Sequence, residues 1–368
     1  MLVIIFYILG FIAIENFTVT LPDKQRIKNQ TIWCYILLCG FFCFRGLPVL
    51  NDTSHYYAYQ IHAISDLQSL QSIFDVEWGT SIEVGFQVLQ HFIAKYISTD
   101  PYAIIMITAL ACSIGLVWFI RMYTDALPFT LFLLAGMSYL FSFYAAMRQS
   151  LAAILFFVAI YLWDKKGKKI VPIALIGLAW LFHDSVIVCL IPFVLSYFEV
   201  SKKNIIRYIV ILTISVIALY PILEMLSYSD SMYVERALQR ESPALAAFLN
   251  LSFYAILLIW VYLNHSKQFI IENKMLIWCG LTCIFFHLCA LQILIFERFG
   301  LYFSIFVVLL FVKALYASRS KSTIKILLIL VLLIRTFIVL EYRNEWLHLV
   351  PYSFYDFGDY YHQTDFGY

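Results

Sequence analysis

The sequence predicts an all-α polytopic membrane protein with about 12 transmembrane helices and one further re-entrant or interfacial helix. Of its 368 residues, 63% are hydrophobic and only 13% are charged. Apolar runs of about 15–22 residues recur along the chain, which is the length that a helix needs to cross a bilayer. No long polar stretch indicates an appended soluble domain, so we expect one integral membrane domain over residues 1–368.

The predicted spans follow the apolar runs in order. The first run, Met1–Ile14, has no basic flank and no small-residue cleavage site, so it is expected to be a span and not a removable signal. The predicted spans are 1–17, 31–48, 101–121, 127–145, 148–163, 170–182, 184–198, 205–221, 244–263, 275–296, 299–315 and 323–340.

The distribution of Lys and Arg predicts which loops are cytoplasmic. Sixteen of the 25 basic residues lie in 22–30, 164–169, 199–207, 264–274 and 316–325 and at Arg121. The segments between them, 49–100, 222–243 and 341–368, are mainly acidic and rich in Tyr and Trp. These segments and both termini are expected outside, where aromatic side chains suit a membrane interface or a sugar ring.

The apolar run 170–198 has basic clusters at both ends, so both ends are expected inside. A single helix over this run would be about 44 Å long and would place one cluster outside. We therefore predict a hairpin of two short helices. Its tip is His183-Asp184-Ser185, where the only charged residue of the run lies.

Segment 82–97 carries polar residues at the spacing of one helical face. They are Glu83, Gln87, Gln90 and His91. If this segment crossed the membrane, Arg121 would lie outside and the later basic loops would be inverted. We predict a re-entrant or interfacial helix on the outer side. The alternative is a spanning helix whose polar stripe faces a cavity.

The cysteines and the missing motifs limit the chemistry. All eight cysteines lie in apolar runs and none forms Cys-x-x-Cys, so we expect core residues and not disulfides or metal ligands. The sequence has no carboxylate cluster of metal-binding spacing, no phosphate-binding glycine loop and no dinucleotide fingerprint. We predict no metal, no cofactor and no nucleic-acid partner.

Three arginines are candidate phosphate ligands, because charge beside the hydrocarbon core is costly and a planar guanidinium suits phosphate oxygens. Arg148 begins a predicted span, Arg298 lies in the break at Glu297-Arg298, and Arg45 lies near the outer end of the second span. The alternatives are a snorkelling arginine for Arg148 and a structural ion pair for Glu297-Arg298.

Candidate bases and acceptor residues lie beside the same breaks. A neutral His183 could take a proton from a sugar hydroxyl, whereas the alternative is that Asp184 or Ser185 only caps the second helix. Glu297 is a second candidate base. Asp52 opens an aromatic stretch and could receive an acceptor sugar, although a solvated loop acid fits equally.

The chain resembles the EpsG/Wzy-type polysaccharide polymerases over most of its length. The similar motifs, in order, are Arg45 before Asp52-x-x-x-Tyr56-x-x-Tyr59, Glu83-x-Gly85-Phe86, Met147-Arg148-Gln149-x-x-Ala152, Ala179-x-x-Phe182-His183-x-Ser185, Arg298-x-x-x-Tyr302-Phe303 and Trp346 ahead of Pro351-Tyr352. Each motif is short, and the resemblance rests on their order and spacing.

The resemblance implies a GT-C-like glycosyltransferase of the bacterial inner membrane whose active site faces the periplasm. Such an enzyme transfers a growing glycan from undecaprenyl pyrophosphate to the next lipid-linked repeat unit of an O-antigen, capsule or exopolysaccharide. In this role Arg148, Arg298 and Arg45 would bind the pyrophosphate, and His183 or Glu297 would be catalytic. The glycan or acceptor would contact Asp52, Tyr56, Glu83, Gln149, Arg236 and Tyr352.

The implied partners are the lipid-linked oligosaccharide and membrane lipid, and a chain-length regulator protein is a further candidate. Two other functions fit the same residues. A ligase would transfer the glycan from the same donor to another acceptor. A flippase or transporter is the non-enzymatic alternative, although that class commonly shows internal repeats and polar groups deep in the bilayer.

Overall fold

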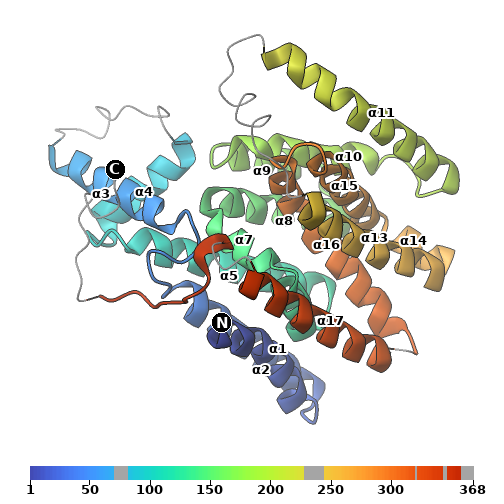
Figure 1. Cartoon of the computed structure of the whole chain (residues 1–368), viewed down its shortest axis with the longest axis horizontal. Coiled ribbons are helices and arrows are strands. Elements are labelled where there is room, and N and C mark those ends of the chain that lie inside the picture. The colour runs from blue at the N-terminus through green and yellow to red at the C-terminus, as the bar shows by residue number, and fades with distance from the viewer. Residues whose placement is uncertain (70–81, 228–243, 320, 343–345, 358–368) are drawn as a thin grey trace. The chain divides into compact units, whose positions relative to one another are not determined.

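The computed structural model describes residues 1–69, 82–227, 244–319, 321–342 and 346–357 (Figure 1). The chain divides into two compact units. The first unit comprises Met1–Ile187 and Ser322–Tyr368, and the second comprises Val188–Lys321. Within the described ranges both units are built from helices, as the sequence predicts.

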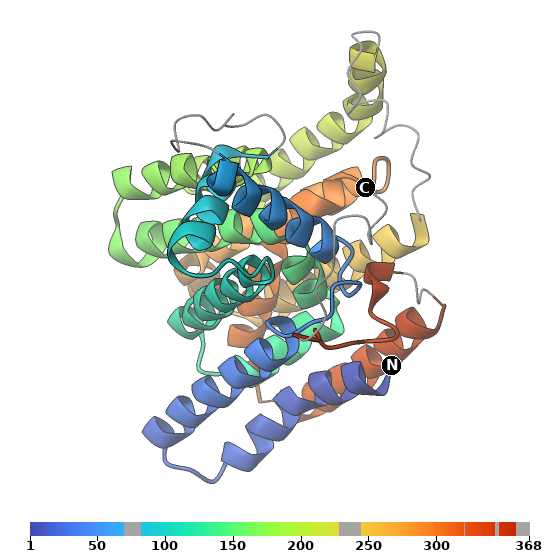
Figure 2. The same ribbon diagram turned by 90° about the vertical axis from the view of Figure 1, so that its left-hand side faces the viewer.

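The first unit contains the amino-terminal helices and the last long helix. They are α1 (Leu2–Thr18), α2 (Asp23–Phe42), α3 (Thr53–Ser69), α4 (Val84–Tyr96), α5 (Ala103–Tyr123), α6 (Leu127–Gly136), α7 (Tyr139–Ala145), α8 (Met147–Lys166), α9 (Ile170–Trp180), α17 (Lys321–Tyr342) and the short 3-10 helix η3 (Trp346–His348). Helices α1 and α2 lie side by side in both views (Figures 1 and 2). Helix α5 packs against α2 and α8, α8 packs against α9, and α3 packs against α4.

The ends of α8 follow from its sequence. Its first residue comes after Ala146, whose backbone is not helical (φ −84°, ψ 63°). Its last turn contains Lys165 and Lys166, whose charges suit the negative end of the helix dipole. Gly167 then ends the helix in the left-handed conformation, φ 62°, which favours glycine. Position 148 is thereby fixed in the first turn of a long helix.

The predicted span 127–145 is divided into α6 and α7, which are bent by 78° relative to each other. Ser138 lies at the break in a left-handed conformation, φ 66°. Arg335 of α17 donates from Nη1 to the Gly136 carbonyl at 2.9 Å and to Ser138 Oγ at 3.1 Å. These bonds satisfy polar groups that the break removes from the helical pattern, as helix breaks at membrane depth require.

The second unit is organised around α16 (Phe296–Ala317), which packs against α13 and α15. The other helices of this unit are α10 (Ile191–Leu195), α11 (Lys202–Ser227), α13 (Ala244–Asn264), α14 (Lys267–Glu272) and α15 (Lys274–Ala290). Of the apolar window in α16, 83% is buried inside the protein, so this helix forms the core of the unit. The 3-10 helix η2 (Asp184–Leu190) precedes α10.

The helices agree with a multi-pass membrane protein. Among the described residues, five helices are long and apolar enough to cross a bilayer, or six if the bent α6–α7 pair is one span. Shorter apolar helices at Leu2–Thr18, Ile170–Trp180, Asp184–Leu195 and Lys274–Ala290 coincide with four more predicted spans. The two remaining predicted spans overlap α2 and α11. The number of crossings, about 12, stays a prediction.

Helix α4 is the helix predicted in segment 82–97. It has 13 residues and is about 20 Å long, which is too short to cross the hydrocarbon core. Its polar residues Gln87, Gln90 and His91 are buried, and Gln60 of α3 donates to the Gln90 carbonyl at 3.1 Å. The predicted polar stripe therefore faces the protein interior.

The described part of the carboxy-terminal segment runs antiparallel to residues 44–46. The Gly46 N–H donates to the Ser353 carbonyl at 2.8 Å, and the Tyr355 N–H donates to the Phe44 carbonyl at 2.9 Å. The ring of Tyr355 stacks on Tyr102 with centroids 3.7 Å apart. Residues 353–355 are thus held against the start of the loop that leads into α3.

Candidate active site

Glu83 lies immediately before α4 at its N-cap position, with an extended backbone (φ −61°, ψ 138°). Its side chain makes no capping hydrogen bond to the helix, although its carbonyl accepts the Phe86 N–H at 3.0 Å. The carboxylate is therefore directed away from its own helix. It contacts residues from two distant segments of the first unit.

The first partner of Glu83 is Arg148, in the first turn of α8. Arg148 Nη1 forms a short charged hydrogen bond to Glu83 Oε2. The two side chains are 28% and 14% exposed, so the pair is largely shielded and still reachable from outside the protein. Ion pairs in such partly buried surroundings are less screened by salt than exposed ones.

The second partner is His183, in the break between α9 and η2. The His183 N–H donates to the Ala179 carbonyl at 3.1 Å, which fixes the residue at the end of α9. His183 Nδ1 lies 2.8 Å from Glu83 Oε1, and the imidazole is 26% exposed. One carboxylate therefore joins Arg148 and His183, and we call these three residues the Glu83 junction.

Tyr56 of α3 completes the surroundings of Arg148. Its hydroxyl is hydrogen bonded to the side chain and the backbone of Arg148. Burial raises the pKa of Tyr56 above its ordinary value, and the positive charge of Arg148 acts in the opposite direction. Tyr56 is therefore a neutral hydroxyl that restricts the position of the guanidinium.

The charges within the junction keep Glu83 ionised. Burial acts to raise the pKa of the Glu83 carboxyl, but the hydrogen bond with His183 and the charge of Arg148 outweigh it. The pKa therefore lies below the ordinary value of 4.5. Because an ionised carboxylate only accepts hydrogen bonds, His183 must carry a proton on Nδ1. In the neutral imidazole the lone pair is then on Nε2, as a general base requires.

Arg45 has internal partners in the structure. It is 1% exposed, and it donates from Nη1 to the Phe42 carbonyl at 2.7 Å and from Nε to Thr53 Oγ1 at 3.0 Å. Its Nη2 group lies 3.4 Å from both the Tyr144 carbonyl and Met147 Sδ. A substrate phosphate could reach this guanidinium only if some of these bonds were exchanged.

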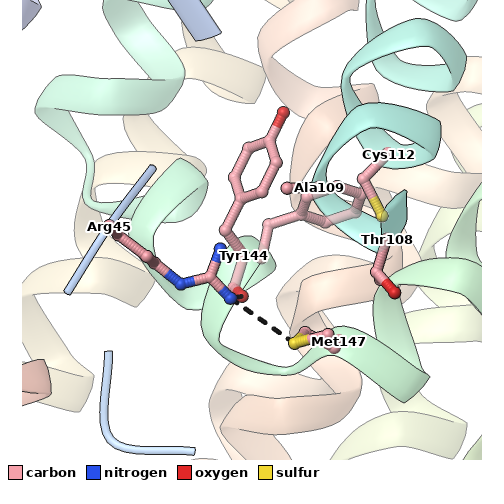
Figure 3. A pocket seen from close by; sticks show the side chains of 7 residues that line it. Arg45, Thr108, Ala109, Cys112, Tyr144 and Met147 are labelled. Atoms are coloured by element: carbon pink, nitrogen blue, oxygen red, sulfur yellow. Dashed lines mark hydrogen bonds between the residues drawn. The ribbon is translucent and has the colours of Figure 1, made fainter. Parts of the chain in front are cut away.

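A small pocket lies beside Arg45, and Figure 3 shows the side chains around it and the contact between Arg45 and Met147. It is lined by Arg45, Thr108, Ala109, Cys112, Phe143, Tyr144 and Met147. It has about 160 Å³ of empty space but essentially no room for a water molecule, so it is too tight for a ligand. We interpret it as a packing gap. It lies next to the junction, because Met147 directly precedes Arg148.

Glu297 and Arg298 belong to the second unit, at the start of α16. Glu297 Oε1 accepts a hydrogen bond from Asn250 Nδ2 of α13 at 2.7 Å, and Arg298 is exposed. His287 is buried close by in the same unit, where the charge of Glu297 acts on it. The predicted roles of Glu297 and Arg298 stay predictions.

The remaining candidates have different surroundings. Asp52 is half-buried just before α3, and its carbonyl accepts the Tyr56 N–H at 3.1 Å. Gln149 is 3% exposed. The Tyr352 hydroxyl donates to the Phe41 carbonyl, which uses its polar group within the protein. Arg236 lies outside the described residues.

One feature of the site was not assigned from the sequence. Glu83 was predicted on the glycan side, whereas the structure places it between the candidate base and the candidate phosphate ligand. The motif Glu83-x-Gly85 marks this residue without indicating its partners. Over the described part of the chain, no group of three or more His, Cys, Asp or Glu side chains is arranged to hold a metal ion.

The helices and the shielded charges of the Glu83 junction define a multi-pass membrane protein with a candidate active site. The model of the EpsG family matches residues 28–354, which include all three junction residues. The chain therefore belongs to the EpsG family, a family of Wzy-like polysaccharide polymerases. Neither the curated proteins nor the solved structures contained a match to the chain.

Proposed function

We propose that the protein polymerises undecaprenyl-pyrophosphate-linked oligosaccharide repeat units at the outer face of the bacterial inner membrane. The observation that carries this proposal is the Glu83 junction, in which one carboxylate joins an imidazole and a guanidinium. A polymerase that uses this donor needs a base for the acceptor hydroxyl and positive charge for the leaving pyrophosphate. The junction offers both at one place in a chain of the EpsG family.

In the proposed reaction His183 Nε2 takes the proton of the acceptor hydroxyl. The hydroxyl oxygen forms a bond to the anomeric carbon of the donor glycan. The bond between that carbon and the pyrophosphate oxygen breaks, and undecaprenyl pyrophosphate leaves with the electron pair. Glu83 orients the imidazole through Nδ1 and stabilises the imidazolium that results, and such orientation commonly supports general-base catalysis.

Arg148 is the proposed ligand of the pyrophosphate. Glu83 engages Nη1, and within the described residues Arg148 Nε is a buried donor without a hydrogen-bond partner. A buried unsatisfied donor is costly, so an anionic oxygen that reached it would remove an existing penalty. Preorganised positive charge at the leaving group is commonly the largest contribution to catalysis of this kind.

The other candidates keep their proposed roles outside the junction. Arg298 is proposed as a second pyrophosphate ligand because it is exposed at the start of α16, and Glu297 beside it as an alternative base. The acidic, aromatic segments are proposed to hold the glycan, with Tyr56 beside Arg148 and Asp52 in the loop before α3. The proposed partners are the lipid-linked oligosaccharide, membrane lipid and a chain-length regulator protein.

The test is polymerisation by purified protein in liposomes that contain the native lipid-linked repeat unit. Wild type should give a ladder of product lengths on a gel. Arg148→Ala should give none, whereas Arg207→Ala, which removes an exposed arginine of α11, should give the wild-type ladder.

Three outcomes would contradict the proposal. A normal ladder from Arg148→Ala rules out the pyrophosphate ligand. Transfer of a single repeat unit to a different lipid acceptor, without a ladder, identifies a ligase. Unchanged substrate that has crossed the bilayer identifies a transporter.

A further inference from the structure

We propose that Gly85 is a positioning residue that sets the distance between Glu83 and His183. The Gly85 N–H donates to the Leu181 carbonyl at 2.7 Å. Glu83 lies two residues before Gly85, and His183 lies two residues after Leu181. A single backbone hydrogen bond therefore joins the two short segments that carry the carboxylate and the imidazole.

This bond links two helix ends that each need a partner. Gly85 lies in the first turn of α4, where N–H groups have no acceptor within their own helix. Leu181 directly follows α9, where the last carbonyl groups have no donor within theirs. The two ends satisfy each other, so the start of α4 and the end of α9 are fixed in mutual register.

Only glycine permits this approach. A Cβ atom at position 85 would lie 2.7 Å from the Leu181 carbonyl oxygen and 2.9 Å from both the carbonyl carbon and Leu181 Cβ. These contacts are shorter than real Cβ atoms show, and two of them are to backbone atoms that no rotamer change can remove. A side chain at this position must push α4 away from the end of α9.

A displacement of α4 from the end of α9 would change the geometry of the Glu83 junction, because apolar neighbours of the junction residues share one core. Phe86 follows Gly85 and is completely buried, and Phe182 follows Leu181 and packs against the same hydrophobic cluster. Met147, which precedes Arg148, is also part of this cluster. Each junction residue thus has a chain neighbour, or a near neighbour, anchored in one core. Because this core holds the neighbouring residues in place, a wider Gly85–Leu181 contact would move Glu83 away from His183.

Helix propensity and steric contact predict opposite effects of Gly85→Ala. The backbone of Gly85 is not in the left-handed region, so alanine suits its conformation and is the better helix former. The Leu181 contact alone opposes the substitution. Gly177→Ala in α9 is the matched control, because it adds a Cβ with no atom within 4 Å in the helix that ends beside Leu181.

The kinetic test rests on the proposed polymerase function. We expect Gly85→Ala to lower kcat on the order of 10²-fold, the effect of a misplacement of about 1 Å, with little change in KM. Gly177→Ala should keep the wild-type kcat. In a His183→Gln background Gly85→Ala should cost almost nothing further, because residues that act through one another are not additive. Additive effects on kcat would overturn the proposal.

Leu181→Ala separates the backbone contact from the side-chain contact. It removes most of the Leu181 side chain but keeps the carbonyl oxygen that lies closest to a Cβ at position 85. We therefore expect that Leu181→Ala does not restore kcat to Gly85→Ala. Full recovery in the double variant would contradict a fixed backbone register.

A second measurement needs neither a variant nor activity, so it stays informative if the polymerase function is wrong. Hydrogen exchange of wild-type protein in detergent reports on the Gly85 amide directly. We expect it to exchange slowly, because it is bonded to Leu181, although first-turn amides without an acceptor exchange fast. Fast exchange at Gly85 would overturn the proposed link between α4 and α9, and with it the positioning role.

Discussion

Glu83 Oε1 and His183 Nδ1 lie 2.8 Å apart, although the two residues are separated by 100 positions in the chain. The contact is possible because Glu83 lies immediately before α4 and His183 follows the end of α9, and the two helix ends meet through Gly85 and Leu181. The imidazole is thereby given a defined tautomer, since the ionised carboxylate can only accept a hydrogen bond from it. In the neutral imidazole the other nitrogen, Nε2, then holds the lone pair for the chemistry that we propose.

His183→Gln should lower kcat by about 10²- to 10⁴-fold, the range for loss of a general base, while the protein remains folded. Product formation from the native lipid-linked repeat unit, followed over time, checks this. His62→Gln is the control, because His62 is an exposed histidine of α3. Equal rates for wild type and His183→Gln would assign the base to another residue, with Glu297 the first to examine.

Glu83→Gln should reduce thermal stability in a pH-dependent way. The pKa of Glu83 is lower in the folded protein than its ordinary 4.5, so the charged contacts stabilise fully above about pH 4.5. That stabilisation is lost as the pH falls through the folded pKa. The difference in Tm between wild type and Glu83→Gln should therefore be largest near pH 7 and should shrink below about pH 4.5.

Glu272→Gln provides the comparison for this experiment. Glu272 is an exposed glutamate of α14 that accepts a hydrogen bond from Gln268, and its substitution should leave Tm nearly unchanged at every pH. If the difference in Tm between wild type and Glu83→Gln stayed constant from pH 7 to pH 4, the Glu83 charge would not stabilise the junction.

Arg45→Met should lower stability more than it alters substrate binding. Its guanidinium is buried and donates to the Phe42 carbonyl and Thr53, so its loss leaves buried acceptors unsatisfied at about 1–3 kcal/mol. A lower Tm with a nearly wild-type KM for the folded fraction is expected. Wild-type Tm together with a raised KM would instead identify Arg45 as a pyrophosphate ligand, as the sequence analysis predicts.

Removal of divalent cations should not stop polymerisation. The proposed reaction assigns the leaving-group charge to arginine and the proton transfer to His183, and neither role needs a metal ion. The ladder should therefore persist in excess EDTA, measured with wild type in the liposome assay. Loss of the ladder in EDTA and its recovery with magnesium would show that a metal contributes.

The membrane sidedness can be tested with alkaline phosphatase, which is active only outside the cytoplasm. Fusions after Asp52 and after Asp100 should both be active, because segment 49–100 is predicted to lie outside and α4 within it is too short to cross. A fusion after Gly167, beside the predicted cytoplasmic lysines, should be inactive. Activity after Asp52 but not after Asp100 would mean that the segment between them crosses the membrane.

Much of the architecture follows from periodicity and charge spacing. The twelve predicted spans each overlap a helix, and the predicted break at His183 lies where α9 gives way to η2. The helix in segment 82–97 follows from polar residues that repeat on one face, and its placement outside the bilayer, which rests on the basic loops that come after it, stays a prediction. These features depend on neighbouring residues along the chain, which is the information that a sequence contains directly.

The direction of the α4 polar face could not be predicted in the same way. Gln87, Gln90 and His91 are buried, whereas Val88 and Phe92 are 49% and 51% exposed. The helical period identifies two faces but does not say which one meets protein and which one meets lipid. That choice depends on the polar groups of α3, such as Gln60, which give the buried face its partners.

The sequence by itself determined that this is a helical membrane protein, that the run 170–198 breaks at His183, and that Arg148 and His183 are candidates for chemistry. Only the tertiary structure decided that Glu83 joins them and that the Arg45 guanidinium is used internally. The physical reason is that hydrophobic patterns act over a few residues, whereas these contacts close loops of 65 and 100 residues. Such contacts depend on how helix ends pack against each other. At this site Gly85, which has no Cβ, allows the start of α4 to contact the end of α9.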